Sequence, residues 1–390
     1  MDIQLPDSQC TGCGSCALTC PVHAITMKEH ADGFFYPDID QSKCVRCTQC
    51  LKACHVLQDP EINLPSACYA VQIKDKQVLN KSTSGGMFFA LARVILSEHG
   101  VVYGCVYDDE YNAVIQRAEA LEQLLPMHGS KYVWSDPSKS YPAVKRDLEE
   151  GRIVLYTGLP CQVAGLKKYL KNKYETLYTV DILCGGAPSP YAFKRYLETL
   201  ADAAGRIELN FQFRDKDKFG SGVNCTYTVN GVKYYENYLE NSFYFAFSSK
   251  SRITWRESCY SCDYKSIKRV SDMTIGDYWG VENHHKKFNP KDGVSVVLVN
   301  TKQGRELFES VKISIYFEDS KVEYATERNS LVREIEDGHV KMPVDRDAFF
   351  CTLRNDGWNT ADNKFLTRRK KMLLKMKVVQ MIKRLKRILR

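Results

Sequence analysis

The sequence predicts an α/β (α+β) protein in which a small cysteine-rich module precedes a mixed-sheet domain and a basic helix follows it. Three observations lead to this prediction. Eight of the 16 cysteines lie between residues 10 and 54. From residue 68 onward, segments with strand-like and helix-like hydrophobic spacing alternate, which is typical of α/β domains. Residues 364–390 contain twelve Lys and Arg and no acidic residue.

The cysteine-rich module contains two runs with the same spacing. The first has two residues between each of its first three cysteines, three before the fourth, and Pro21 after it. The second repeats this spacing, but His55 stands where the first has proline. This is the bacterial ferredoxin pattern, in which the fourth cysteine of each run binds the other cluster. We therefore expect two 4Fe-4S clusters, one on Cys10, Cys13, Cys16 and Cys54, the other on Cys44, Cys47, Cys50 and Cys20.

Structural zinc is the alternative for these cysteines, because paired C-x2-C sequences also bind zinc. Four cysteines at this spacing, repeated, fit a zinc site poorly. A disulfide framework fits less well still, because nothing else in the sequence indicates a secreted protein. Gly12 and Gly14 are small residues at points where the backbone must approach a cluster closely.

Length and composition indicate a globular protein of two or three domains, with 390 residues, 44% hydrophobic and 26% charged. The net charge of +8 becomes −4 when the basic residues of 364–390 are left out, so the chain is not a uniformly basic nucleic-acid binder. Residues 1–9 lack the features of a signal peptide. No segment approaches the ~20 apolar residues of a membrane-spanning helix. We therefore expect a cytoplasmic protein in a reducing environment.

Hydrophobic spacing and turn residues divide the chain into segments. We expect the cysteine module at 1–56, a proline-containing linker at 57–67, one α/β domain in two parts at 68–150 and 151–345, a connector at 346–363, and the basic helix at 364–390. Within the domain, Asn230-Gly231 between two strand-like segments predicts a β-hairpin. A helix is expected to open at Ser84-Gly85-Gly86 and to end at Gly100.

A second group of cysteines lies in loops of the predicted domain. Cys161 follows a strand and a glycine-containing turn, and Cys184 also follows a strand. In open α/β sheets the carboxyl ends of strands are where ligands bind. With Cys259 and Cys262, these residues predict a third 4Fe-4S cluster, and zinc is the competing ligand. We expect the remaining four to be small buried side chains, namely Cys68, Cys105, Cys225 and Cys351.

Several motifs, in order, resemble the β subunit of the coenzyme F(420)-reducing hydrogenases and dehydrogenases, over residues 68 to about 345. They are Ser84-Gly85-Gly86, Gly129-Ser130-Lys131-Tyr132, Thr157-Gly158-x-Pro160-Cys161-Gln162, Asp181-x-x-Cys184-Gly185, Cys259-x-x-Cys262 and the segment from Ser271 to Gly280. In one departure, Gly185 stands where this family commonly has His. The resemblance implies FAD and one 4Fe-4S cluster in this domain, and electron transfer between a two-electron partner and one-electron carriers.

The resemblance also implies which residues contact the flavin. These are Ser84, Gly85, Gly86, Gly129, Ser130, Lys131, Tyr132, Thr157, Gly158 and Gln162, with Asp272, Gly276, Asp277 and Trp279 as further candidates. Physical chemistry agrees at two points. Backbone N–H groups at a Ser-Gly-Gly helix start can bind pyrophosphate, and a cation such as Lys131 or Arg214 can stabilise a reduced, anionic flavin. The alternative is that these glycine-rich segments are ordinary turns.

The sequence therefore predicts an iron–sulfur flavoprotein oxidoreductase that works with a redox partner protein or a small electron carrier. A non-catalytic electron-relay subunit and a zinc-stabilised binding module are the alternatives. A deazaflavin, a nicotinamide and an organic compound all stay open as the two-electron substrate. At the C-terminus, apolar residues of 364–390 recur every three or four positions between the basic ones. This pattern predicts an amphipathic helix for peripheral contact with anionic membrane, or for docking on protein.

Overall fold

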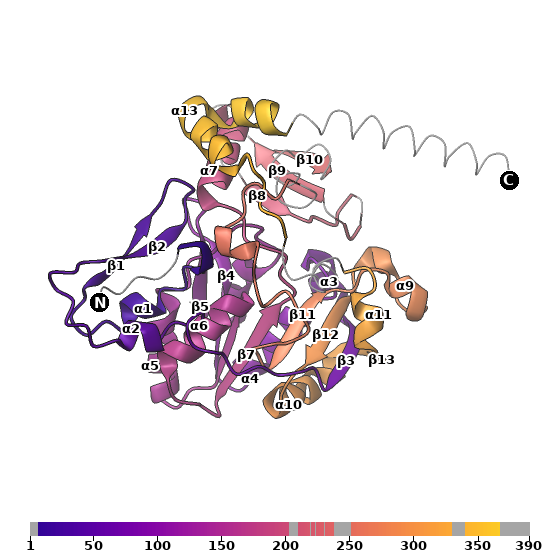
Figure 1. The fold of residues 1–390 in the computed structure, drawn as a ribbon. Helices are drawn as coiled ribbons and strands as arrows, with labels where there is room; N and C mark the ends of the chain where they lie inside the picture. The colour runs from indigo at the N-terminus through magenta and orange to yellow at the C-terminus, as the bar shows by residue number, and fades with distance from the viewer. Residues whose placement is uncertain are drawn as a thin grey trace.

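The cysteine-rich module forms a small lobe built on one β-hairpin. The structure is a computed structural model and describes residues 7–202, 210–218, 220–222, 224–229, 231–237, 251–329 and 340–366. The hairpin pairs β1 (Ile25–Glu29) with β2 (Phe35–Ile39), and the lobe projects at the left of Figure 1. A short helix lies within each cysteine run, α1 (Ser15–Leu18) and α2 (Gln49–Lys52). Both helices begin after a residue with positive φ, Gly14 or Thr48, which turns the chain sharply between cysteines.

The main domain is organised on an eight-stranded mixed sheet in the order β13-β3-β12-β11-β7-β6-β4-β5. Its strands are β3 (Ala67–Ile73), β4 (Val101–Tyr107), β5 (Ala113–Ala118), β6 (Val154–Gly158), β7 (Leu177–Ile182), β11 (Met273–Asp277), β12 (Ser295–Val299) and β13 (Ile315–Ser320). Four central strands, β11, β7, β6 and β4, are parallel. Their carboxyl ends therefore lie at one edge of the sheet. Both predicted parts of the domain contribute strands, so 68–150 and 151–345 share one sheet.

Helices cover both faces of this sheet (Figure 1). One face packs against α4 (Met87–Ser97) and α10 (Lys302–Val311), and the other against α5 (Ser140–Glu149) and α6 (Pro160–Leu170). Neighbouring residues of one strand alternate between the two faces, so Val102 belongs to the first core and Val101 to the second. Short elements complete the domain, namely α3 (Lys76–Lys81), η2 (Leu121–Met127), α9 (Val281–His284), η4 (Pro290–Asp292), η5 (Lys312–Ser314) and α11 (Val322–Thr326).

A second core lies above the sheet in Figure 1, around α7 (Pro190–Asp202) and α13 (Arg346–Phe365). It includes a three-stranded sheet of β8 (Asn210–Phe213), β9 (Asn224–Val229) and β10 (Val232–Asn237). Segment 346–363, expected as a connector, is therefore helical and packs on α7. Gly357 interrupts α13 with a φ of 81°. The basic helix predicted for 364–390 lies outside the described residues from 367 onward.

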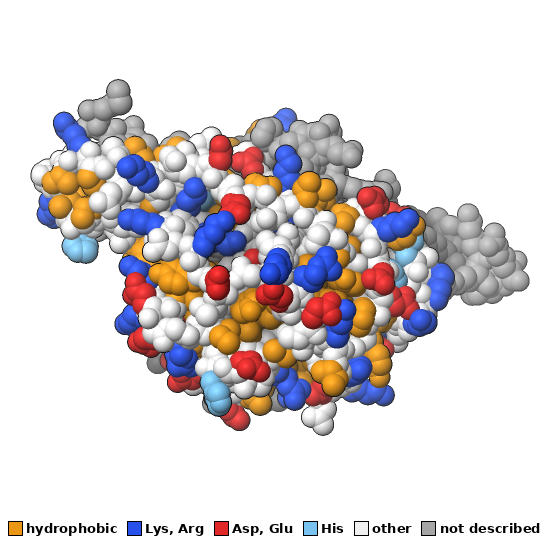
Figure 2. All heavy atoms as spheres, turned by 90° about the horizontal axis from the view of Figure 1, so that it is seen from below, with side chains coloured by type: hydrophobic (Ala, Val, Ile, Leu, Met, Phe, Trp, Pro, Cys, Tyr) orange, Lys and Arg blue, Asp and Glu red, His pale blue; other side chains and the backbone are white. Residues whose placement is uncertain are grey.

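Most of the predicted elements are confirmed. The Asn230-Gly231 hairpin is present, with Val229 opposite Val232. The helix expected to open at Ser84 begins only at Met87, because Gly86 has a φ of 81° that a helix cannot include. Where the structure describes the chain, no helix is long and apolar enough to span a bilayer. On the face seen in Figure 2, acidic and basic side chains are interspersed.

Candidate functional site

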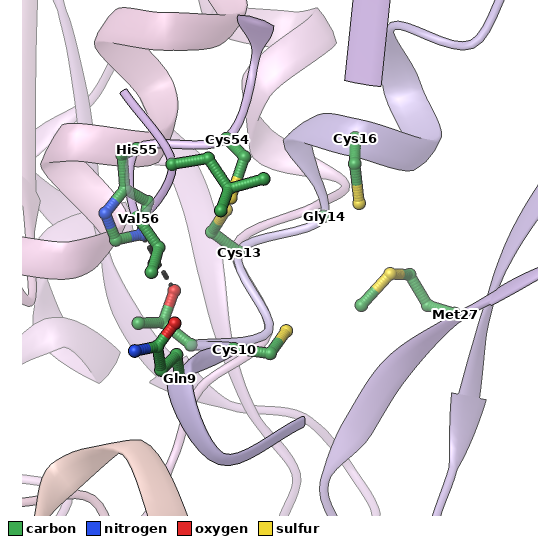
Figure 3. A pocket seen from close by; sticks show the side chains of 11 residues that line it. Gln9, Cys10, Cys13, Gly14, Cys16, Met27, Cys54, His55 and Val56 are labelled. Atoms are coloured by element: carbon green, nitrogen blue, oxygen red, sulfur yellow. Dashed lines mark hydrogen bonds between the residues drawn. The ribbon is translucent and has the colours of Figure 1, made fainter. Parts of the chain in front are cut away.

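The structure gathers Cys10, Cys13, Cys16 and Cys54 around one cavity at the base of the lobe. Figure 3 shows their sulfur atoms facing a common space, with Met27 of β1 on the opposite side. Sequence reasoning grouped these four cysteines together, although Cys54 lies 38 residues beyond Cys16. Positive φ angles at the intervening glycines bend the first run around the cavity, with 72° at Gly12. We call this space the first cavity.

The second cavity lies at the outer end of the lobe. Its wall includes the other predicted quartet, Cys20, Cys44, Cys47 and Cys50, together with Pro21 and Val45. The backbone N–H of Ala24 donates to Cys20 Sγ at 3.2 Å. Cys47 is exposed. The module thus holds two four-cysteine cavities.

The third cavity lies within the main domain and is lined by Cys161, Cys184, Cys259 and Cys262. Cys161 is in the first turn of α6, and Cys184 comes two residues after β7 ends. Cys259 closes the turn η3 (Glu257–Cys259) and accepts a hydrogen bond from the N–H of Ala187 at 3.4 Å. Burial raises the pKa of Cys184 to about 12 and that of Cys262 to about 11. Thiolates in this cavity therefore require a positive occupant.

Two buried cations face this third cavity, Arg256 and Lys265. Nη1 of Arg256 and Nζ of Lys265 have no hydrogen-bond partner among the described residues. A group that is held by four thiolates and carries net negative charge would match both the sulfur donors and these cations. The donor set therefore fits a 4Fe-4S cluster. A four-cysteine zinc site has the same net charge and stays the alternative.

The single-metal alternative differs from a cluster in its geometry. One zinc ion needs its ligands to converge on one point at about 2.3 Å from each sulfur. The four thiols of each cavity line one shared space, and zinc stays the alternative to a multi-iron cluster.

A fourth cavity, of about 300 Å³, opens at the carboxyl edge of the parallel strands. We call it the flavin cavity because most of the residues predicted to contact flavin line it. These are Ser84, Gly86, Gly129, Ser130, Lys131, Tyr132, Thr157, Gly158, Gln162, Gly276 and Asp277. They come from four separate segments of the chain, so the fold rather than any one motif assembles this wall. Backbone glycines beside a cavity with polar and apolar walls fit a dinucleotide such as FAD.

Three predicted flavin residues, Gly85, Asp272 and Trp279, are not among those that line this cavity. A Cβ on Gly85 would lie 2.2 Å from the carbonyl oxygen of Val71, so this glycine packs against β3. The carboxylate of Asp272 accepts hydrogen bonds from Thr179 and Thr301, which is a structural role. Trp279 is 39% exposed.

The two candidate cations, Lys131 and Arg214, already have protein partners. Nζ of Lys131 donates to the carbonyls of Pro126 and His128 at 2.7 and 2.8 Å. Burial lowers the pKa of Lys131 to about 8. The guanidinium of Arg214 pairs with Asp277 and donates to Tyr132 Oη at 3.1 Å. Both cations therefore organise the cavity wall, and a role toward flavin stays a prediction.

Several residues that shape these cavities were missed by sequence reasoning. Nζ of Lys216 donates to the carbonyls of Leu79 and Ser84, which fixes the Ser-Gly-Gly loop against the segment that follows β8. His55 bonds Tyr264 and Thr11, which joins the module to the domain. Arg256 and Lys265 lie three residues before Cys259 and three after Cys262, a proximity that could have identified them.

The remaining four cysteines differ in burial. Cys68 and Cys225 are buried as expected. Cys105 is half-buried on the wall of the flavin cavity. For Cys351 the expectation of burial is wrong: it lies on an exposed face of α13, because the helix turns its aromatic residues, not this thiol, toward α7.

Two family models match the chain. Residues 151–324 match the family described as the C terminus of the coenzyme F420 hydrogenase/dehydrogenase beta subunit. Residues 9–57 match the 4Fe-4S dicluster domain. The first match spans β6 through α11 and includes the four cysteines of the third cavity, and the second spans both cavities of the module.

Curated relatives are distant. The chain is 22% identical over 329 residues to the coenzyme F420-dependent sulfite reductase of Methanocaldococcus jannaschii, which covers 78% of this chain and 46% of that protein. It is 20% identical over 322 residues to one of the subunits of the F(420)H(2) dehydrogenase of Methanosarcina mazei, covering 78% of this chain and 82% of that one. The chain thus spans less than half the length of the sulfite reductase.

Among solved structures, a chain of the F420-reducing [NiFe] hydrogenase complex from Methanosarcina barkeri is similar to this one, with a TM-score of 0.43 and 17% identity. The similarity covers 78% of this chain and 92% of that chain.

Proposed function

We propose, on the premise that residues 151–324 belong to the family of coenzyme F420 hydrogenase/dehydrogenase beta subunits and residues 9–57 to the 4Fe-4S dicluster family, that this chain is a flavin-dependent iron–sulfur oxidoreductase. When bound, FAD would exchange a hydride with a two-electron partner and single electrons with 4Fe-4S clusters.

The observation that carries the proposal is the order of the four cavities. Leu159 lines both the flavin cavity and the third cavity. Thr11 lines both the third cavity and the first. The first cysteine run contributes to both cavities of the module, with Cys16 in the wall of the first and Cys20 in the wall of the second. Four cavities therefore follow one another from the domain into the module, and we call this series the row.

The chain's own residues would hold this row rigid. Gln162 donates to the carbonyl of Ser135 at 2.8 Å and accepts from the N–H of Leu159 at 2.8 Å. These bonds fix the residue shared by the flavin cavity and the third cavity. Trp134 Nε1 donates to the carbonyl of Thr11 at 3.3 Å, which fixes the residue shared by the third and first cavities. Rigid spacing between redox groups is what efficient electron transfer requires.

The outer end of the row suits contact with an electron carrier. Cys47 is exposed there, and the side chain of Val45 on the wall of the second cavity is 61% exposed. Apolar side chains also gather on the outer end of the lobe at the left of Figure 2. The partner would be a redox protein or a small one-electron carrier. Single exposed apolar residues are normal on monomers. The exposed edge of the second cavity therefore supports contact with a carrier more strongly than the apolar side chains do.

Light-driven reduction tests this function without requiring knowledge of the substrate. Protein reconstituted anaerobically with iron, sulfide and FAD, then freed of unbound flavin, is illuminated with a sacrificial donor and frozen for EPR spectroscopy. Cluster signals should appear as the flavin absorbance bleaches. Gly86→Val should abolish both flavin retention and these signals but keep the iron, because residue 86 has a φ of 81° and its Cβ would lie 2.6 Å from Ile73.

Gly231→Val is the matched control, because Gly231 also has a positive φ, 75°, but meets nothing within 4 Å and lies at the β9–β10 hairpin. It should keep flavin and cluster reduction. Cluster signals that appear equally without bound flavin would instead favour a non-catalytic relay subunit whose partner performs the two-electron chemistry.

A further inference from the structure

Among the residues that the structure describes, Arg256 differs from the other buried arginines in lacking a carboxylate partner. In the described segments, four arginines are buried: Arg214, Arg256, Arg269 and Arg346. Three of them pair with an aspartate, as Arg269 does with Asp181 at 2.8 Å and Arg346 with Asp32 at 2.7 Å. Arg256 is 1% exposed, and no ion pair to it is present among the described residues. A buried charge without a countercharge costs free energy, so something else must supply the negative charge.

The contacts of Arg256 join the module to the domain. Its Nε donates to the carbonyl of Cys10 at 2.7 Å and its Nη2 to the carbonyl of Phe35 at 2.9 Å. The guanidinium also lies over the rings of Tyr36, at 4.1 Å, and Trp134, at 5.7 Å. Carbonyls and rings are weak partners for a full charge, since they orient the cation without neutralising it.

The third nitrogen of the guanidinium points to where the missing charge would be. Nη1 is buried and has no partner in the described part of the chain. A Cβ on Gly12, between Cys10 and Cys13, would lie 2.9 Å from it. Arg256 also lines the third cavity beside Cys259. The guanidinium therefore lies between the first cavity and the third.

We propose that Arg256 is the shared countercharge of the clusters in the first and third cavities, and that it sets how readily electrons pass between them. The inference rests on the proposed function, because it assumes that both cavities hold clusters. Each reduction adds one electron, and hence one negative charge, to a cluster. A fixed cation within a dry interior favours the reduced form and raises the reduction potential of any cluster near it.

Lys265 supplies a matched control for this inference. Its Nζ is buried without a hydrogen-bond partner among the described residues, 4.4 Å from the ring of Trp255. Like Arg256 it lines the third cavity and not the first, but only Arg256 bonds the carbonyl of Cys10 in the wall of the first. Removing the Lys265 charge should therefore affect one cluster, whereas removing the Arg256 charge should affect two.

The test is an EPR-monitored redox titration of the reconstituted full chain, with dithionite as the reductant. Signals are assigned with Cys47→Ala and Cys259→Ala, which remove the second and the third cluster. Arg256→Gln should move the potentials of the first and third clusters to more negative values, and leave the second unchanged. Lys265→Met should move only the third. A tenfold change in a one-electron equilibrium constant corresponds to about 59 mV, and we expect a change of about that size.

Arg256→Lys separates the effect of the positive charge from the effect of the hydrogen bonds. It keeps the cation but loses the pair of hydrogen bonds to the carbonyls of Cys10 and Phe35. Potentials near those of the wild type in this variant support the proposal, even if the Gln variant loses iron. Iron loss in both variants would show that Arg256 only holds the module against the domain, which would overturn the inference. Equal reduction potentials in the Gln, Lys and wild-type proteins would overturn it as well. A wild-type protein without a third cluster signal would instead overturn the proposed function.

Discussion

The first and second cavities have the same cysteine spacing but different contacts. The first lies against the main domain: Ser15 Oγ donates to the carbonyl of Gly165 on α6 at 2.8 Å. A Cβ on Gly165 would lie 2.8 Å from the Cβ of Cys13, so only glycine permits this approach. The second is open, with Cys47 and Val45 exposed. Spacing thus specifies which metal group is expected, whereas the surroundings specify where electrons would enter and leave.

One thiol of the first cavity is an exception to its neighbours, since burial raises the pKa of Cys10, Cys16 and Cys54. Burial by itself would raise the pKa of Cys13, but hydrogen bonding from His55 and its charge outweigh burial and lower it to about 7. Burial raises the pKa of Cys50 in the second cavity, and backbone hydrogen bonds only partly oppose it. His55 stands where the first run has Pro21, so a single departure from the repeat gives the inner cavity a polar link to Tyr264 of the domain.

Removing one cysteine from each cavity should produce the largest effects. In Cys13→Ala, light-driven reduction should reach only the third cluster, because the row is interrupted next to Thr11. In Cys47→Ala it should reach the third and first clusters, while reduction of an added one-electron dye slows at least tenfold. Each variant should lose up to about four iron atoms. Freeze-quenched EPR and dye absorbance measure both; equal loss of inner cluster reduction in the two variants would contradict the contrast between the cavities.

The sequence was sufficient to predict the grouping of the cysteines but not their surroundings. The pattern of the ferredoxin-like runs placed Cys54 with Cys10 and Cys20 with Cys44, because that pairing is a property of the repeat. The loop positions of Cys161 and Cys184, with the C-x2-C spacing of Cys259 and Cys262, predicted the third group. Arg256 was not predicted, because its role depends on contacts with Cys10 and Phe35, both more than 200 residues away.

The flavin residues show the same limit. The resemblance implied that Ser84, Gly129 and Thr157 belong to one site, and the structure places all three on the wall of one cavity. Asp272 belongs to the same motif, yet its carboxylate is used by Thr179 and Thr301, 93 residues before it and 29 after it. Helix α13 was expected as a connector because its spacing is interrupted at Gly357, and its core partners on α7 are distant in sequence.

The smallest effect is expected from removing the basic tail. A chain that ends at Leu366, which is 2% exposed and completes the core around α13, should keep its iron, flavin and potentials. If the tail binds membrane as its sequence suggests, only the full chain should sediment with anionic vesicles at low salt, since each basic residue near such a surface contributes ~1 kcal/mol. Neutral vesicles are the control. Equal sedimentation of the truncated and full chains would contradict the membrane hypothesis. Altered reduction potentials of the clusters in the truncated chain would show that the tail contacts the row of cavities.

Iron and labile sulfide analysis of anaerobically reconstituted protein tests the central claim most directly. Three four-cysteine cavities predict about twelve iron atoms and about twelve sulfides per chain. Cys259→Ala should lower both to about eight, because it opens the third cavity and leaves the module intact. Bound zinc in place of iron, or about eight iron atoms that Cys259→Ala leaves unchanged, would contradict a continuous row of clusters from the flavin cavity to the outer end of the module.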